Sequence, residues 1–320
     1  TVIRYSDADL AELLDRLSQC YEGGKTFKEF VRLGAVRHPR RALPEDSFAF
    51  LRRHTLGRPR DLVIIASELS RNQGALGEPL YRSLVAETSA AVLVPNVFEE
   101  MRAFLECLED RGERLRFLGL LPYNVLTRAD VVEVWLRFNG MGPEHAGAFE
   151  WDAPGLHHPF WELYGTGLLG VVAREPDGRA AVQRFKQPHD LTDYSRPALP
   201  EAEFYLIHPA LDGFIRRHRP AGDYHLFQHI VVGHGCPWKE HYRTLHAIER
   251  RLFTLPGEDL RESVHAALKE VTAALSAGRP GRARAKAAGS ETWGALGERL
   301  AAAGHDELRR LLDELIGREA

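Results

Sequence analysis

Apolar residues recur at spacings of three and four along most of this chain, which predicts a mainly helical protein. Residues 7–21 give the clearest example, because four leucines between positions 10 and 17 share one helix face behind an Asp-rich first turn. Pro95 is expected to end one helix and Asn96 to cap the next. The periodicity predicts further helices over 59–69, 75–94, 96–108, 128–138, 209–218, 244–255 and 257–278.

Alternating apolar and polar positions predict a few short strands in the second half of the chain. Residues 168–175 and 181–185 are expected to form a β-hairpin around a turn at 177–179, and a further strand is expected at 203–207. The alternation over 223–232 predicts another strand. Together with the helices, these strands predict the fold class as mainly α with small β.

The order of these elements predicts a helical lid bundle, then a winged-helix domain, then a C-terminal helical tail. Two helices followed by a β-hairpin are typical of a winged helix. The expected segments are a lid-like domain at 1–112, a winged-helix-like domain at 113–240, a helical extension at 241–278, a basic Gly/Ala/Pro linker at 279–290 and a helical hairpin at 291–320.

Residues 52–69 combine a cluster of cations with a strong helix start. Pro59 fits the first turn of a helix, and Thr55 is the expected cap. The cations therefore gather near a helix N-terminus, where backbone N–H groups favour anions and guanidinium groups bind phosphate bidentately. They are Arg52, Arg53, His54, Arg58 and Arg60. A nucleotide phosphate is one ligand that fits this chemistry.

Two other interpretations of this stretch stay open. A basic helix start is more often a solvated helix end, or the partner of a carboxylate in the same chain, than a ligand site. Alternatively, residues 62–65 form a buried strand followed by Ser67 and Glu68, similar to the strand that ends in a catalytic acid in P-loop ATPases. Pro59 and the good helix formers after the apolar run favour the helix.

Two short motifs resemble the C-terminal half of bacterial STAND-type P-loop ATPases, a branch of the AAA+ and NLR-like switch proteins. The motifs are HTLGRPRDLV at 54–63 and YLIHPALDGF at 205–214. In that family a helical lid and a winged helix follow the ATPase core and close over the nucleotide. The resemblance implies a regulatory, nucleotide-sensing and interaction region of a switch in bacterial signalling or defence against phage, without catalytic activity of its own.

The resemblance also implies which residues face the cofactor, ATP or ADP. The GRPRD segment would correspond to the lid motif that approaches the nucleotide. The IHP segment would correspond to the winged-helix motif whose histidine senses the ADP phosphate. The implied nucleotide-binding residues are Gly57, Arg58, Pro59, Arg60 and His208. No catalytic residue and no metal ligand is assigned.

The sequence GGKT at 23–26 resembles the end of a phosphate-binding P-loop but does not fit the motif. The pattern G-x-x-x-x-G-K-[ST] requires glycine where this chain has Gln19, and it requires a strand where the periodicity predicts a helix. We interpret these glycines as a helix stop. ATP or ADP would therefore be shared with a P-loop core outside this chain, and the chain alone is not expected to hydrolyse ATP.

Two other functions remain as alternatives. A winged-helix DNA-binding transcription regulator would place its recognition helix within 157–165, but that stretch contains Glu162 and no Arg or Lys, so DNA is not an expected partner. A metal-dependent enzyme would use the His-rich region, whose candidate ligands are His225, His229, His234, Cys236 and His241. The first two lie about 13 Å apart along a strand, which is too far for one ion.

Composition narrows the choice of partners. A net charge of −3 gives no overall attraction to nucleic acid or anionic lipid. Cys20, Cys107 and Cys236 are far apart in the sequence, which fits a reducing cytoplasm better than a disulfide framework. No apolar run is long enough to cross a membrane. The amphipathic tail makes a protein partner or an ATPase core the expected partner, and a homo-oligomer is compatible with it.

Overall fold

The computed structural model describes residues 5–41, 43–151, 158–174, 180–190, 198–219, 224–276 and 291–317. It is mainly α with small β sheets, as predicted. The chain divides into two compact units, of which unit 1 comprises 1–36, 45–226 and 232–237, and unit 2 comprises 37–44, 227–231 and 238–320. Most of the predicted lid-like segment and most of the predicted winged-helix-like segment lie in unit 1.

The N-terminal part of unit 1 is a bundle of helices that hydrophobic periodicity predicts well. Its elements are α1 (Asp7–Tyr21), α2 (Phe27–Val31), β1 (Ala35–Val36), β2 (Glu45–Asp46), α3 (Ser47–Arg53), α4 (Pro59–Arg71), η1 (Gln73–Ala75), α5 (Glu78–Thr88) and α6 (Val94–Glu100). Reciprocal side-chain caps start α1 at Ser6 and α2 at Thr26. The glycines between these helices end α1, because Gly23 and Gly24 have positive φ angles.

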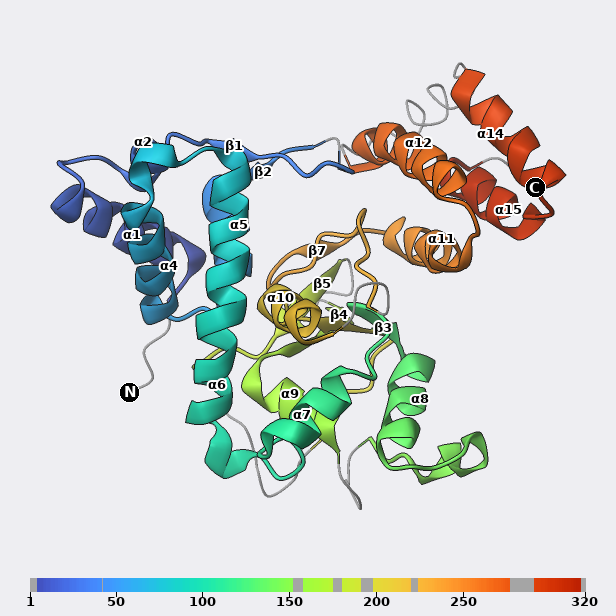
Figure 1. The fold of residues 1–320 in the computed structure, drawn as a ribbon, viewed down its shortest axis with the longest axis horizontal. Helices are drawn as coiled ribbons and strands as arrows, with labels where there is room; N and C mark the ends of the chain where they lie inside the picture. The colour runs from blue at the N-terminus through green and yellow to red at the C-terminus, as the bar shows by residue number, and fades with distance from the viewer. Residues whose placement is uncertain are drawn as a thin grey trace. The chain divides into compact units, whose positions relative to one another are not determined.

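The break expected at Pro95 is wrong, because α5 continues through a π-helical turn, η2 (Ser89–Leu93), into α6. Figure 1 shows α5 and α6 as one long rod. Pro95 lies in the first turn of α6, where a missing N–H is tolerated, so Asn96 is inside the helix rather than its cap. The side chain of Ser89 donates to the carbonyl of Val85 at 2.7 Å within the continuous rod.

The second part of unit 1 builds an antiparallel sheet with helices around it. Its elements are η3 (Arg102–Phe104), α7 (Arg111–Leu118), β3 (Val125–Thr127), α8 (Arg128–Phe138), η4 (Pro143–Ala148), α9 (Pro159–Thr166), β4 (Leu169–Arg174), β5 (Ala181–Phe185), β6 (Phe204–Ile207), α10 (Pro209–His218) and β7 (Pro237–Trp238). The strand order is β3-β6-β4-β5-β7. The predicted hairpin forms between β4 and β5, whereas most of its turn lies outside the described residues.

Strand β6 is an interior strand of this sheet and carries the second motif into α10. It pairs antiparallel with β3 on one side and β4 on the other, so that Leu206 lies opposite Val125 and Gly170. All four residues of β6 are buried. Gly213 of α10 approaches η2 so closely that a Cβ atom there would lie 2.9 Å from the Cβ of Ala90. The motif is therefore anchored to both the sheet and the long helical rod.

The strand expected over 223–232 does not form in the described residues 224–232, apart from an isolated bridge at His225. Within unit 2, side chains satisfy this backbone in place of a neighbouring strand. The buried carboxylate of Glu249 accepts the N–H groups of Gln228 and His229 at 2.5 and 2.8 Å. Periodicity alone does not distinguish a strand from an extended segment held in this way.

Unit 2 is otherwise helical. Its helices are α11 (Tyr242–Thr254), α12 (Glu258–Ser276), α14 (Glu291–Ala302) and α15 (Asp306–Leu315). Leucines spaced at three and four along these helices are buried, among them Leu245, Leu268 and Leu312. The predicted linker at 279–290 lies outside the described residues. No helix in the described parts of the chain has the length and apolar character needed to span a membrane.

Replacing Glu162 by glutamine is expected to destabilise unit 1. The buried Glu162 carboxylate accepts the N–H groups of Glu106, Cys107 and Leu108 at 3.0, 2.7 and 2.9 Å. An amide offers only one acceptor oxygen, so we expect the free energy of unfolding to fall by about 2–3 kcal/mol in urea titrations. Glu144→Gln, at an exposed position, is the matched control. Equal stability of the two variants would contradict this assignment.

Candidate functional site

The loop between α3 and α4 is held in shape by its own backbone and by one buried carboxylate. Asp61, which is 1% exposed, accepts the N–H of Leu56 at 3.0 Å. Burial raises the pKa of Asp61, and the nearby Arg58 opposes that shift. Thr55 does not cap α4 as expected, because its hydroxyl donates to the carbonyl of Arg52 at 2.7 Å. Pro59 lies in the first turn of α4, as predicted.

Gly57 is the point at which this loop requires glycine. Its φ is +80°, a conformation that other residues rarely adopt. A Cβ atom at this position would also lie 2.4 Å from Oε1 of Gln187. The same amide oxygen accepts from Nη2 of Arg52 at 3.2 Å. The loop and the segment after β5 are therefore packed too closely to admit a side chain.

The guanidinium groups of Arg58 and Arg60 share one carboxylate, that of Glu100 at the end of α6. Arg58 Nη1 lies 2.5 Å from one Glu100 oxygen, and Arg60 Nη1 lies 2.5 Å from the other. Hydrogen bonding from Arg60 is the main cause that lowers the pKa of Glu100, and it raises the pKa of Arg60. The interpretation of these cations as partners of a carboxylate in the same chain is therefore correct for this structure.

The remaining cations of the stretch also have partners. Arg52 is buried, with its Nε 2.8 Å from Asp7 Oδ1. Arg53 donates from Nε to Glu45 at 2.7 Å. The ring of His54 lies 2.7 Å from the carbonyl of Phe50. Apart from Arg58 and Arg60, which share Glu100, these cations have different partners, so the five do not converge on one point.

His208 links the two motifs that the resemblance singles out. It is the N-cap of α10, where its Nδ1 accepts the N–H of Ala210 at 3.2 Å. The backbone of Thr55, in the loop before α4, lies near this side chain and acts to raise its pKa. The ring is 2% exposed, and it meets Phe185 edge-on at 5.2 Å. Burial, followed by the charge of Arg52, lowers the pKa of His208 to about 3, so the imidazole is neutral.

Two polar cavities lie beside this link in unit 1. The larger, about 760 Å³, is lined by Arg52 and His234, among others. The smaller, about 480 Å³, is lined by Arg58 and Glu100, among others. Both cavities share a wall made of Lys186, Gln187 and Asp190. The sequence does not predict this wall, because residues 186–202 have the polar, Pro-rich composition of a spacer.

The structure does not bring the implied nucleotide-binding residues to one cavity. Among these two cavities, Arg58 lines the smaller, whereas Arg60 and His208 line neither. Lys186 is the cation that reaches both, and its Nζ donates to the carbonyl of Gly165 at 3.1 Å. Burial lowers the pKa of Lys186. A contact of Gly57, Arg58, Pro59, Arg60 or His208 with a nucleotide stays a prediction.

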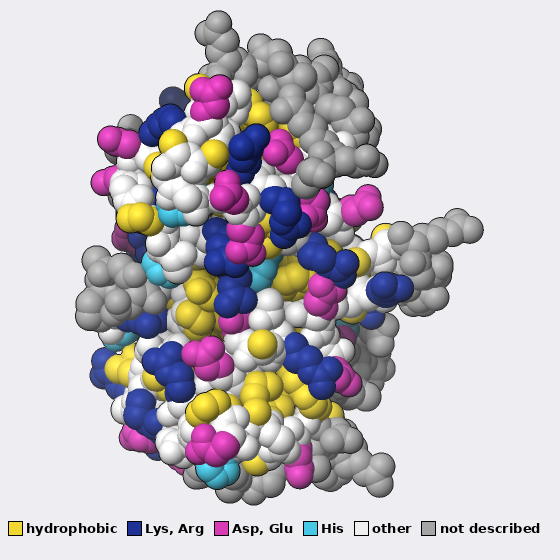
Figure 2. All heavy atoms as spheres, turned by 90° about the vertical axis from the view of Figure 1, so that its right-hand side faces the viewer, with side chains coloured by type: hydrophobic (Ala, Val, Ile, Leu, Met, Phe, Trp, Pro, Cys, Tyr) yellow, Lys and Arg dark blue, Asp and Glu magenta, His cyan; other side chains and the backbone are white. Residues whose placement is uncertain are grey.

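Helix α9 coincides with the candidate recognition helix at 157–165, and its side chains pack inside unit 1. Phe160, Glu162 and Leu163 are all buried, with the Glu162 carboxylate turned to backbone N–H groups. On the face drawn in Figure 2, Lys and Arg side chains are interspersed with Asp and Glu side chains. Both features argue against a DNA-binding surface at these places.

The His-rich region does not assemble a metal site among the described residues, where no group of three or more His, Cys, Asp or Glu side chains is placed to hold an ion. His229 instead lies against His265 in unit 2, with Nε2 and Nδ1 separated by 3.1 Å. In unit 1, Nδ1 of His234 accepts the N–H of Phe185 at 3.3 Å. The histidines therefore belong to separate local networks.

Comparisons of this chain with protein-family models, with curated proteins and with solved structures found no match. The function is therefore argued from the geometry of the site.

Replacing Gly57 by alanine is expected to destabilise the loop that carries the first motif. The positive φ and the close approach of Gln187 both oppose a Cβ atom, so we expect a loss of about 1–3 kcal/mol in the free energy of unfolding. Gly34→Ala is the control, because nothing lies within 4 Å of a Cβ built there. Urea unfolding of both variants tests this. A Gly57→Ala protein as stable as the control would show that the loop is not constrained.

The buried neutral imidazole of His208 predicts a loss of stability in acid. Its pKa is about 3 in the folded protein and near 6.5 when unfolded, so its stabilising effect is complete above pH 6.5 and is lost as the pH falls below it. When the pH is lowered from 7 to 5, we expect the free energy of unfolding to fall by about 2 kcal/mol less for His208→Asn than for wild type. Asparagine keeps an N-cap acceptor.

The measurement is urea unfolding of wild type and His208→Asn at pH 7, 6 and 5. His145→Asn, at an exposed position, controls for general effects of removing a histidine. Parallel pH profiles for wild type and His208→Asn would refute the assignment of a neutral, buried imidazole.

Proposed function

We propose that this chain is the regulatory part of a STAND-like ATPase switch, in which it covers a nucleotide bound by a P-loop core outside the chain. The observation that carries the proposal is the approach of the His208 side chain to the backbone of Thr55. The two motifs are about 150 positions apart in sequence, and nothing in their spacing requires contact. Their meeting is what a lid and a winged helix that act together require.

The sheet supports the same proposal. In a winged helix, a first strand is followed along the chain by two helices and two further strands. In the sheet, the last of these strands lies between the other two. Here β3, α8, α9, β4 and β6 follow that order, and β5 is an addition at the outer edge of β4. The helix that carries His208 at its cap then follows β6 directly.

In the proposed mechanism, His208 acts as a latch and not as a phosphate ligand. A nucleotide beside the loop Leu56–Arg58 would compete with Glu100 for Arg58 and draw the loop toward its phosphates. Because Thr55 precedes this loop and its backbone lies beside His208, such a movement would change the contact between the loop and α10. Ligand contacts that differ between the arrangements before and after this movement would bias a switch between them.

The cellular role of the chain is proposed only from its resemblance to STAND-type ATPases. It implies a cytoplasmic protein in bacterial signalling or defence, with the ATPase core as the first partner and a homo-oligomer as a further state. The alternative of a DNA-binding regulator is less well supported, since α9 is packed and lacks cationic residues.

The test is the rate of ADP release from the complete protein encoded by the reading frame that contains this chain. Weakening the latch with His208→Asn should speed release of a fluorescent ADP analogue about three- to tenfold, the effect of losing one buried polar contact. Stopped-flow fluorescence measures the rate directly.

His145→Asn serves as control, and its release rate should match wild type. The proposal fails if the complete protein has no G-x-x-x-x-G-K-[ST] motif after a strand. It also fails if the protein binds ADP but His208→Asn leaves the release rate unchanged.

A further inference from the structure

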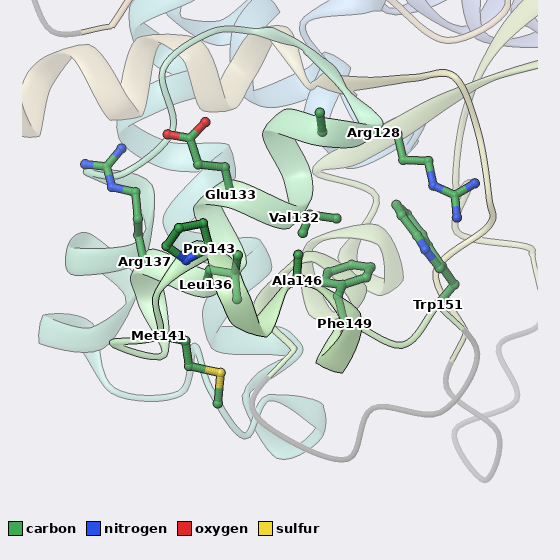
Figure 3. Close-up of a pocket in the computed structure, with 11 residues that line it drawn as sticks. Arg128, Val132, Glu133, Leu136, Arg137, Met141, Pro143, Ala146, Phe149 and Trp151 are labelled. Carbon is green, nitrogen blue, oxygen red and sulfur yellow. The ribbon is translucent and has the colours of Figure 1, made fainter.

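An apolar cavity of unit 1 lies away from the two motifs, along α8. It has a volume of about 1060 Å³ and is formed by one face of α8, by η4 and by two aromatic side chains (Figure 3). Its lining residues are Arg128, Ala129, Val132, Glu133, Leu136, Arg137, Met141, Pro143, Ala146, Phe149 and Trp151. The α8 residues span nine positions, or roughly 13 Å of helix. The cavity is therefore an elongated trough parallel to α8.

The apolar wall of the trough is held rigid by its neighbours. The ring of Trp151 stacks on that of Tyr205, with 5.7 Å between the ring centroids. The guanidinium carbon of Arg128 lies over the Trp151 ring, 4.6 Å from its centroid. Phe149 meets the buried Trp135 edge-on at 5.3 Å. These contacts fix the two aromatic rings before any ligand arrives, so binding does not require them to be ordered.

The polar end of the trough is formed by Glu133 and Arg137, one helical turn apart. Figure 3 shows both side chains at the end away from Trp151. Within the described residues, neither has a hydrogen-bond or ion-pair partner at this end. Arg128, at the other end, is already paired with Glu201 and lies over Trp151. Arg137 is therefore the cation of the trough that is left to meet the head group of an anionic ligand, with Glu133 beside it.

We propose that this trough binds an amphiphilic carboxylate, with its apolar chain along α8 and its carboxylate at Arg137. The chain would lie on Val132, Leu136 and Ala146 and end against Phe149 and Trp151 (Figure 3). Each CH₂ group of such a chain that is removed from water should strengthen binding about fourfold. The carboxylate head group would orient the ligand in the trough, because Arg137 attracts it and Glu133 repels it. This site is independent of the proposed nucleotide switch.

The test titrates decanoate into the chain by isothermal calorimetry, below its micelle concentration. Saturable binding is expected at one site. Because both charges are exposed, Arg137→Gln should weaken decanoate binding about two- to fivefold, and Glu133→Gln should strengthen it by a similar factor. Decyltrimethylammonium, which has the same chain and the opposite charge, should show the reverse order in both variants.

A substitution that fills the trough provides the second arm. Val132→Trp places a large ring on the half-buried face of α8 that lines the cavity, and it should abolish decanoate binding while leaving the helical circular dichroism signal unchanged. Arg71→Gln, at an exposed position on α4, is the charge control and should bind as wild type does. Binding that survives Val132→Trp, or that does not respond to either charge change, would overturn the proposal. Absence of decanoate binding to wild type would do the same.

Discussion

Buried carboxylates hold the segments of backbone that neither helix nor sheet satisfies. Glu162 accepts three consecutive N–H groups before α7, Asp61 accepts one from the loop before α4, and Glu249 accepts two in unit 2. Buried N–H groups without partners would each cost about 1–3 kcal/mol. A carboxylate at such a position is itself desolvated, and burial raises the pKa of Glu249 to about 7. These loops therefore have one defined shape.

Internal pairing also limits what the cationic stretch can bind. An anion can recruit Arg58 and Arg60 only by replacing Glu100, which is partly exposed. Exchange of partners at an exposed ion pair involves about 0–1 kcal/mol, so a phosphate can displace this carboxylate without a large penalty. Arg52 differs, because its guanidinium is buried between Asp7 and Gln187. Arg52 is better suited to fix the loop than to follow a ligand.

The sequence predicts the helical elements well and the candidate site poorly, for a physical reason. Helix faces depend on residues three or four positions apart, so α1 was predictable. The rod through Pro95 was not, because a π-helical turn leaves no periodic signal. The cavity wall at Lys186, Gln187 and Asp190 depends on pairing between distant segments, and no local pattern encodes which carboxylate a given arginine will meet.

The link at His208 depends on the neutrality of one imidazole. A neutral ring can accept the N–H of Ala210 at Nδ1, whereas a protonated ring loses this acceptor. Phe185 touches this ring and also lines the larger polar cavity, together with Arg52. The charge of Arg52 helps to keep His208 neutral, so an anion in that cavity would offset this charge and weaken the preference for the neutral form. In the proposed switch, an anion in the cavity would therefore act on His208, even though His208 itself does not line the cavity.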